Sequence, residues 1–269
     1  MQDIKTLILK GYQKFEFSLG DESVITKYLK YLETPDLEIR KQVELFHLEL
    51  LESLISIQEH DIKSSNRYIK NLKSSENLRN FWGEKFEVII HSKLIKLVDQ
   101  NAISTVRRGK DGKEPDLLFD FENHQLGIEL TTLKFEKSPN KLELASFKKM
   151  MDKISEKNNN VYANKNTVLF IDISNIEFLN ALMTGNSSVD FLDKYKDQLE
   201  ALSTKLNFKF ILFLESIFYY DSMKNLKRCL NPIAGITDNE KPNSVNRFLN
   251  LAFNDFKKGD NKIYRHQNI

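Results

Sequence analysis

Cysteine is nearly absent from the 269-residue chain, which contains only Cys229. One thiol can form no internal disulfide, and it cannot supply the cysteine ligands of a structural zinc site. Glycine is also scarce, and none of the 9 glycines are spaced as in the phosphate-binding loops of nucleotide-binding proteins. The sequence therefore excludes a disulfide framework, a cysteine-ligated zinc site and a glycine-rich phosphate loop.

Long apolar runs are missing as well. None approaches the roughly 18–20 residues that a membrane-spanning helix needs. The N-terminal stretch MQDIKTLILKGYQKFEF is too polar for a signal peptide, because its apolar core is only LIL. These absences predict a protein without a membrane span, and we expect a cytoplasmic location.

A large excess of one charge sign is the third absence. The chain has 40 Lys and Arg against 38 Asp and Glu, a net charge of +2. Any nucleic-acid contact must therefore come from a local concentration of basic residues. Such residues flank the stretch 114–135 on both sides. The expected nucleic-acid contacts are Arg107, Arg108, Lys110, Lys113 and Lys134.

Apolar residues make up 41% of the chain, which is enough for a buried core. Residues 1–75 predict helices; one of them has Thr34 as its N-cap and Pro35 in its first turn. A polar, Ser- and Asn-rich stretch at 63–77 is the expected junction. We therefore expect a helical N-terminal region at 1–75 and a second domain at 76–269.

Residues 76–215 alternate between helical and strand-like patterns in the order α-β-β-β-α-β-α-β. The apolar runs NTVLFIDIS and FKFILFLES predict buried strands. This order indicates an α/β fold with a mixed central sheet and helices on both faces. The remainder, which contains Pro232, predicts loops and a helix near 243–257.

The stretch EPDLLFDFENHQLGIELTTLKF, at 114–135, predicts a hairpin with acidic side chains on one face. A two-residue turn at 123–124 would pair positions whose numbers sum to 247. Asp116 would then lie opposite Thr131, with Glu129 one diagonal step away at about 7–8 Å.

Two carboxylates this close repel unless positive charge lies between them, and a divalent cation is the natural candidate. The alternative is a half-exposed hairpin whose acids face water. Glu129 favours a site, because its neighbours in LGIELTTL are apolar and buried strands rarely carry an unpaired carboxylate.

These residues resemble the PD-(D/E)XK nuclease superfamily. The resemblance rests on Pro115-Asp116, the thirteen-residue step to Glu129 in an apolar strand, and the preceding helix with GEKFE. It covers about 76–215 and implies the superfamily's αβββαβ restriction-endonuclease-like core. It further implies that Asp116, Glu129 and the Leu130 carbonyl bind Mg²⁺ or Mn²⁺, assisted by Glu87 or, as a second choice, Glu84.

The chain departs from the superfamily's pattern at Thr131, which stands where the motif has a lysine. A threonine cannot orient the nucleophile by charge or offset phosphate charge. Either the lysine has moved to the next helix, where Lys148 and Lys153 flank the apolar face, or the site is catalytically impaired. Both accounts are open at the level of sequence.

The resemblance implies a nuclease that acts in restriction or anti-phage defence. Its expected substrate is DNA, and RNA is the less favoured alternative. One alternative is an impaired nuclease fold that binds nucleic acid or a partner protein. Another is a helical interaction module without a site. Many nucleases use two copies to cut both strands, so a homodimer is compatible with this function. The N-terminal helices are the expected contact for a partner protein.

Overall fold

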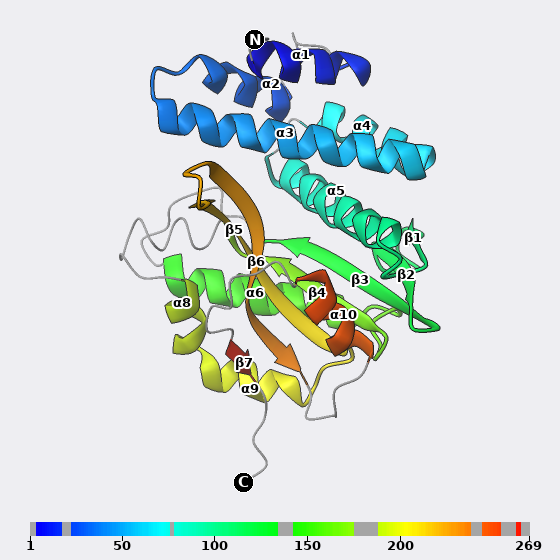
Figure 1. Ribbon diagram of the computed structural model, residues 1–269. Coiled ribbons are helices and arrows are strands. Elements are labelled where there is room, and N and C mark those ends of the chain that lie inside the picture. Colours follow the sequence, from blue (N-terminus) through cyan, green and yellow to red (C-terminus); the bar gives the residue numbers. More distant parts are fainter. Residues whose placement is uncertain are drawn as a thin grey trace. The chain divides into compact units, whose positions relative to one another are not determined.

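The computed structural model describes residues 4–17, 23–75, 78–133, 142–174, 188–237, 244–253 and 262–264 (Figure 1). The chain divides into two compact units. Unit 1 comprises Met1–Asp99 and Ile217–Cys229, and unit 2 comprises Gln100–Ser216 and Leu230–Ile269. Within the described ranges, no helix is both long and apolar enough to cross a membrane.

Unit 1 is built mainly from helices, as the sequence predicts for the N-terminal region. Their apolar faces meet in a core that includes Leu50, Leu54 and Phe81. The elements are α1 (Ile4–Lys14), α2 (Val24–Leu29), the 3₁₀ helix η1 (Lys30–Glu33), α3 (Leu37–His60), α4 (Ile62–Ser74) and α5 (Leu78–Asp99).

The N-cap of α3 is Asp36, two residues later than the predicted Thr34. The Asp36 carboxylate accepts hydrogen bonds from the backbone N–H groups of Glu38 and Ile39, at 2.9 and 3.1 Å. A carboxylate in this position also complements the positive end of the helix dipole. Asp61 separates α3 from α4 and caps the start of α4 in the same way.

The predicted junction at 63–77 is wrong for most of its length, because α4 occupies 62–74. Tyr68 and Leu72 are fully buried in this helix, while its charged residues Lys63, Arg67 and Lys70 are exposed. The next helix, α5, packs against α3. Unit 1 consequently extends to Asp99, whereas the sequence predicts a boundary after residue 75.

Unit 2 holds most of a seven-stranded sheet whose strands lie side by side in sequence order. The tip of the β5–β6 hairpin, residues 217–229, belongs to unit 1. The strands are β1 (Thr105–Arg108), β2 (Leu117–Phe121), β3 (His124–Thr132), β4 (Thr167–Asp172), β5 (Phe210–Tyr220), β6 (Leu226–Thr237) and β7 (Lys262–Tyr264). The helices of unit 2 are α6 (Leu142–Asn158), α8 (Ser188–Lys194), α9 (Lys196–Ser203) and α10 (Ser244–Ala252).

The sheet is mixed, as predicted. β1, β2 and β3 pair in antiparallel fashion, and β3 with β4, β4 with β5, and β6 with β7 pair in parallel. The prediction of loops around Pro232 is wrong, because β6 runs through this residue. Among the described residues, β6 pairs with β7 at Ala234–Ile236, so Pro232 lies outside that ladder.

Helices cover both faces of the sheet, so the predicted α/β fold class is confirmed. Figure 1 shows α6 behind the strands and α10 in front of them. On the α6 side, Phe147 and Met150 join a core with Leu169 of β4. On the other side, the Phe248 ring of α10 lies 4.3 Å from that of Phe119. The element order α5-β1-β2-β3-α6-β4 is the one expected from the sequence.

Candidate active site

The candidate site begins with the register of the β2–β3 hairpin. Phe121 pairs with His124, so the turn is Glu122-Asn123, one residue earlier than predicted. Both turn residues have positive φ, 50° and 62°, as a two-residue hairpin turn of the type I′ class requires. Paired positions sum to 245. This register places Asp116, just before β2, across from Glu129 and corrects the predicted pairing with Thr131.

Two glycines allow the chain to pass closely at Pro115. A Cβ on Gly109 would lie 1.8 Å from the carbonyl oxygen of Pro115, and a Cβ on Gly127 would lie 2.6 Å from its ring. The Gly109 N–H also donates to the Asp116 carbonyl at 2.9 Å. Glycine at both positions therefore sets where the Pro115-Asp116 segment enters the sheet.

Two hydrogen bonds join Asp116 to the Glu129–Leu130 segment. The Leu130 N–H donates to Oδ2 of Asp116 at 2.8 Å, and the Asp116 N–H donates to Oε2 of Glu129 at 3.3 Å. Glu129 is 1% exposed, while Asp116 is partly exposed. The structure thus brings the two predicted acidic residues together, with Glu129 buried and Asp116 partly exposed.

Lys157, near the end of α6, contacts Glu129 directly. Its ammonium group donates to Oε1 of Glu129 and forms an ion pair with it. The Tyr162 hydroxyl donates to the same oxygen at 2.9 Å and accepts a 2.6 Å hydrogen bond from Asn160. A lysine of α6 therefore contacts Glu129, but it is Lys157 rather than the predicted Lys148 or Lys153.

The predicted lysines on α6 lie elsewhere. Lys148 is exposed, and Lys153 pairs with Glu156. Lys157 follows Phe147, Met150 and Ile154 at helical spacing, so it continues the face that packs on the sheet. That spacing was a usable signal for Lys157, whereas nothing in the sequence pointed to Tyr162.

Burial and the neighbouring charge of Glu129 raise the pKa of Asp116 to about 7. The Leu130 N–H, Lys157 and Arg108 oppose this rise. Burial lowers the pKa of Lys157, but the charge and hydrogen bond of Glu129 outweigh it, so the pKa is raised overall. Lys157 consequently stays protonated at neutral pH and acts as a cation rather than as a base.

The remaining predicted site residues are distributed as follows. Thr131 is half-buried on β3. Lys134 lies outside the described residues. Glu87 and Glu84 belong to unit 1, where Glu87 accepts a 3.0 Å hydrogen bond from Tyr68 and Glu84 accepts a 2.8 Å bond from Asn71.

The basic residues that were predicted to contact nucleic acid differ in their surroundings. Arg107 forms a two-fold hydrogen-bonded ion pair with Glu114, at 2.8 and 3.0 Å. Arg108 is half-buried and acts electrostatically on Asp116. Lys110 and Lys113 are exposed. Arg108 is thus the member of this group whose charge reaches the carboxylate pair.

The donor set at the pair fits a hard divalent cation. Oδ1 of Asp116 accepts no hydrogen bond from any described residue, and Oε2 of Glu129 accepts only the 3.3 Å bond. No group of three or more His, Cys, Asp or Glu side chains suited to a metal occurs in the described ranges. Mg²⁺ is commonly held by one or two carboxylates, with water and substrate phosphate completing its shell.

Comparisons with known proteins identified no relative of this chain. No family model matches the chain, and neither curated proteins nor solved structures match it significantly.

Proposed function

We propose that the chain is a metal-dependent nuclease, related to the PD-(D/E)XK superfamily, that hydrolyses phosphodiester bonds in DNA. The observation that carries this proposal is the contact of Lys157 with the Asp116–Glu129 pair. Two adjacent carboxylates and one ammonium group reproduce the residue types of the superfamily motif, although the lysine comes from α6. A role in restriction or anti-phage defence follows from the resemblance.

The carboxylates would hold Mg²⁺ or Mn²⁺, together with the Leu130 carbonyl. Such an ion polarises the scissile phosphate and lowers the pKa of the attacking water when it is bound. Asp116 offers Oδ1, which is turned away from its bond with Leu130. Lys157 and Tyr162 hold Oε1 of Glu129, so they orient its carboxylate and leave Oε2 for the cation.

Lys157 also contributes positive charge to the proposed site. Its protonated ammonium group adds positive charge beside the acids, where the charge of the scissile phosphate would otherwise be repelled. The position of Lys157 also favours an active enzyme over an impaired one, because the substitution at residue 131 is compensated from another element. Arg108 supplies further positive charge at Asp116.

Plasmid cleavage with Mg²⁺ or Mn²⁺ tests the proposal. We expect Asp116→Asn and Glu129→Gln to abolish cleavage, and Lys157→Met to slow it about 100-fold. The matched control is Lys153→Met, which removes the same charge from the same helix. The Lys153→Met protein should cleave DNA at nearly the wild-type rate.

Other outcomes point to the two alternatives. DNA binding without cleavage in either metal would indicate an impaired nuclease fold. Absence of both DNA binding and metal uptake by calorimetry would indicate an interaction module. A parallel assay on RNA distinguishes the nucleic acid that is cut.

A further inference from the structure

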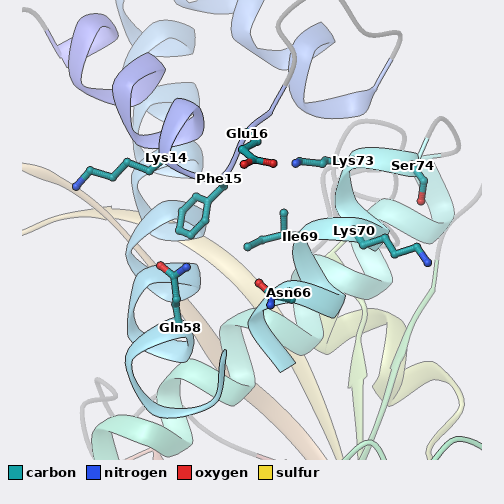
Figure 2. A pocket seen from close by; sticks show the side chains of 9 residues that line it. All are labelled: Lys14, Phe15, Glu16, Gln58, Asn66, Ile69, Lys70, Lys73 and Ser74. Carbon is teal, nitrogen blue, oxygen red and sulfur yellow. The ribbon is translucent and has the colours of Figure 1, made fainter. Parts of the chain in front are cut away.

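Unit 1 contains a pocket of about 620 Å³ that the acidic pair of unit 2 does not line. Its walls come from the end of α1, from α3 and from α4 (Figure 2). The volume lies within the range typical of small-molecule sites, about 300–1,000 Å³. The pocket therefore has room for a ligand with a ring system and a charged group.

The floor of the pocket is apolar and its walls carry amides. Phe15 and Ile69 lie at its centre and are 4% and 8% exposed (Figure 2). Gln58 and Asn66 stand beside them, and neither side chain makes a hydrogen bond with any described residue. An apolar floor next to amide donors and acceptors suits a heteroaromatic base, which has an apolar face and a polar edge.

The rim carries an excess of positive charge. Lys70 and Lys73 follow Asn66 and Ile69 along one face of α4, and Lys14 ends α1. The ammonium group of Lys73 lies 5.4 Å from the centre of the Phe17 ring. Against these three lysines the pocket presents one carboxylate, so its formal charge is +2. Such a rim attracts phosphate groups.

The single carboxylate is Glu16, which occupies an unusual backbone position. Glu16 has φ 55° at the second residue after the end of α1, where a glycine is normally favoured. Bonds from the Glu16 and Phe17 N–H groups to the carbonyls of Gln13 and Tyr12 close this turn. Figure 2 shows the Glu16 side chain directed into the pocket, toward Lys73. A carboxylate placed between base and phosphate contacts is suited to accept hydrogen bonds from ribose hydroxyls.

We propose that this pocket binds a ribonucleotide. Phe15 and Ile69 contact the base, and the amides of Gln58 and Asn66 bond to its edge. Glu16 accepts from the ribose hydroxyls, while the lysines, with Lys73 nearest the floor, bind the phosphates. The site is separate from the proposed nuclease centre and needs neither of its carboxylates.

Calorimetry with the full chain in EDTA tests this binding without any contribution from a metal. The ligands are ATP, dATP, pyrophosphate and a short single-stranded RNA. We expect ATP to bind about tenfold more tightly than dATP, because dATP lacks one hydroxyl that Glu16 accepts from. Pyrophosphate should bind more weakly still, because it has no base to cover the floor.

Two variants locate the site. The Lys70→Ala/Lys73→Ala pair should weaken ATP binding at least tenfold, and Glu16→Gln should bring the affinities for ATP and dATP close together. The control is Lys41→Ala, an exposed lysine on α3 that lies about 25 Å along the helix from Gln58. Glu16→Gln and the lysine changes alter exposed or partly exposed side chains, so each variant is expected to fold.

The outcomes decide the proposal as follows. Loss of ATP binding in the double variant, with binding retained in Lys41→Ala, supports it. Tighter binding of the RNA than of ATP, lost in the same variant, would also support the site and would identify the ribonucleotide as part of a strand. Equal affinity for pyrophosphate and ATP, no binding of any ligand, or unchanged binding in the double variant would overturn it. Because no metal is present, these results are independent of DNA cleavage.

Discussion

The two units of the protein each hold a carboxylate in a charged cluster, but with opposite charge balance. In unit 1, Glu49 contacts two cations, Lys85 at 3.0 Å and Arg228. In unit 2, Asp116 and Glu129 together contact one ammonium group, that of Lys157. The unit 1 cluster thus has an excess of positive charge, and the unit 2 cluster has an excess of negative charge.

The difference separates a structural cluster from a candidate chemical one. Lys85 is 1% exposed and lies 5.0 Å from the centre of the Phe46 ring, so packing and the carboxylate together hold its charge. At the acidic pair, burial and then the neighbouring charge of Glu129 raise the pKa of Asp116, although Lys157 and Arg108 oppose this rise. Two carboxylates that repel each other lower the stability of the folded protein, but they suit the binding of a cation.

The largest expected loss from a single substitution tests the structural cluster. Glu49→Leu removes the carboxylate that both cations contact, and we expect a loss of about 3 kcal/mol in the free energy of unfolding. Lys85→Met should cost less, because Glu49 then keeps Arg228 as its partner. Urea unfolding measures both. The exposed Glu52, on the same helix, provides the control: Glu52→Leu should stay within about 0.5 kcal/mol of wild type. A Glu49→Leu protein as stable as this control would contradict a structural role for the cluster.

The second prediction concerns how unit 2 brings its acids together. In Gly109→Ala, the new methyl group would meet the Pro115 carbonyl at 1.8 Å, so the segment before Asp116 must shift. We expect a loss of about 2 kcal/mol and of metal-dependent cleavage. Gly112→Ala meets no atom within 4 Å but has φ 68°, so strain alone should cost about 1 kcal/mol, and cleavage should persist. Equal losses of cleavage in both variants would refute the role of Gly109 in placing Asp116.

The third prediction uses pH to test the negative excess at the pair. Because the pKa of Asp116 is higher in the folded protein, about 7, than its ordinary value of 3.8, the folded state binds more protons between these values. Wild-type stability should therefore fall, relative to Asp116→Asn, as pH rises from 4 through 7, and the difference should level off above that. The change is on the order of 4 kcal/mol. Unfolding of both proteins at pH 4, 6 and 8 measures it.

Added Mg²⁺ sharpens the same comparison. At pH 8 it should stabilise the wild type and leave Asp116→Asn nearly unchanged, because a cation that binds the folded state shifts the unfolding equilibrium. A stability difference that is independent of pH, or an equal response to Mg²⁺, would argue against a cation site at the pair.

The smallest expected effect concerns the turn that sets the register. Asn123 has φ 62° in a two-residue turn that favours Asn-Gly, so Asn123→Gly should stabilise unit 2 by about 0.5 kcal/mol. Glu122 is kept in this variant, because it forms an ion pair with Arg247. Thermal unfolding measures the shift. A lower melting temperature would show that the Asn123 side chain contributes more than its backbone strain costs.

Several features of the fold could be predicted from local patterns, and others could not. The two buried strands follow from continuous apolar runs, and the hairpin follows from side-chain alternation; both patterns depend only on neighbouring residues. α4 was missed because most of its residues are polar. Its buried face contains few apolar side chains, among them Tyr68 and Leu72. β6 was missed because proline disfavours strands. Pro232 nevertheless lies within β6, outside the pairs that this strand forms with β7 at Ala234–Ile236.

The sequence by itself predicted that Asp116 and Glu129 share one face of a hairpin, because side chains alternate and a two- or four-residue turn gives this parity. Only the tertiary structure decided which cation meets them. Lys157 lies 28 residues beyond Glu129 and reaches it because α6 packs back across the sheet. Tyr162 arrives from the loop after that helix. Contacts between distant segments depend on packing, which no local pattern encodes, so the cation that contacts Glu129 could be identified only in the folded chain.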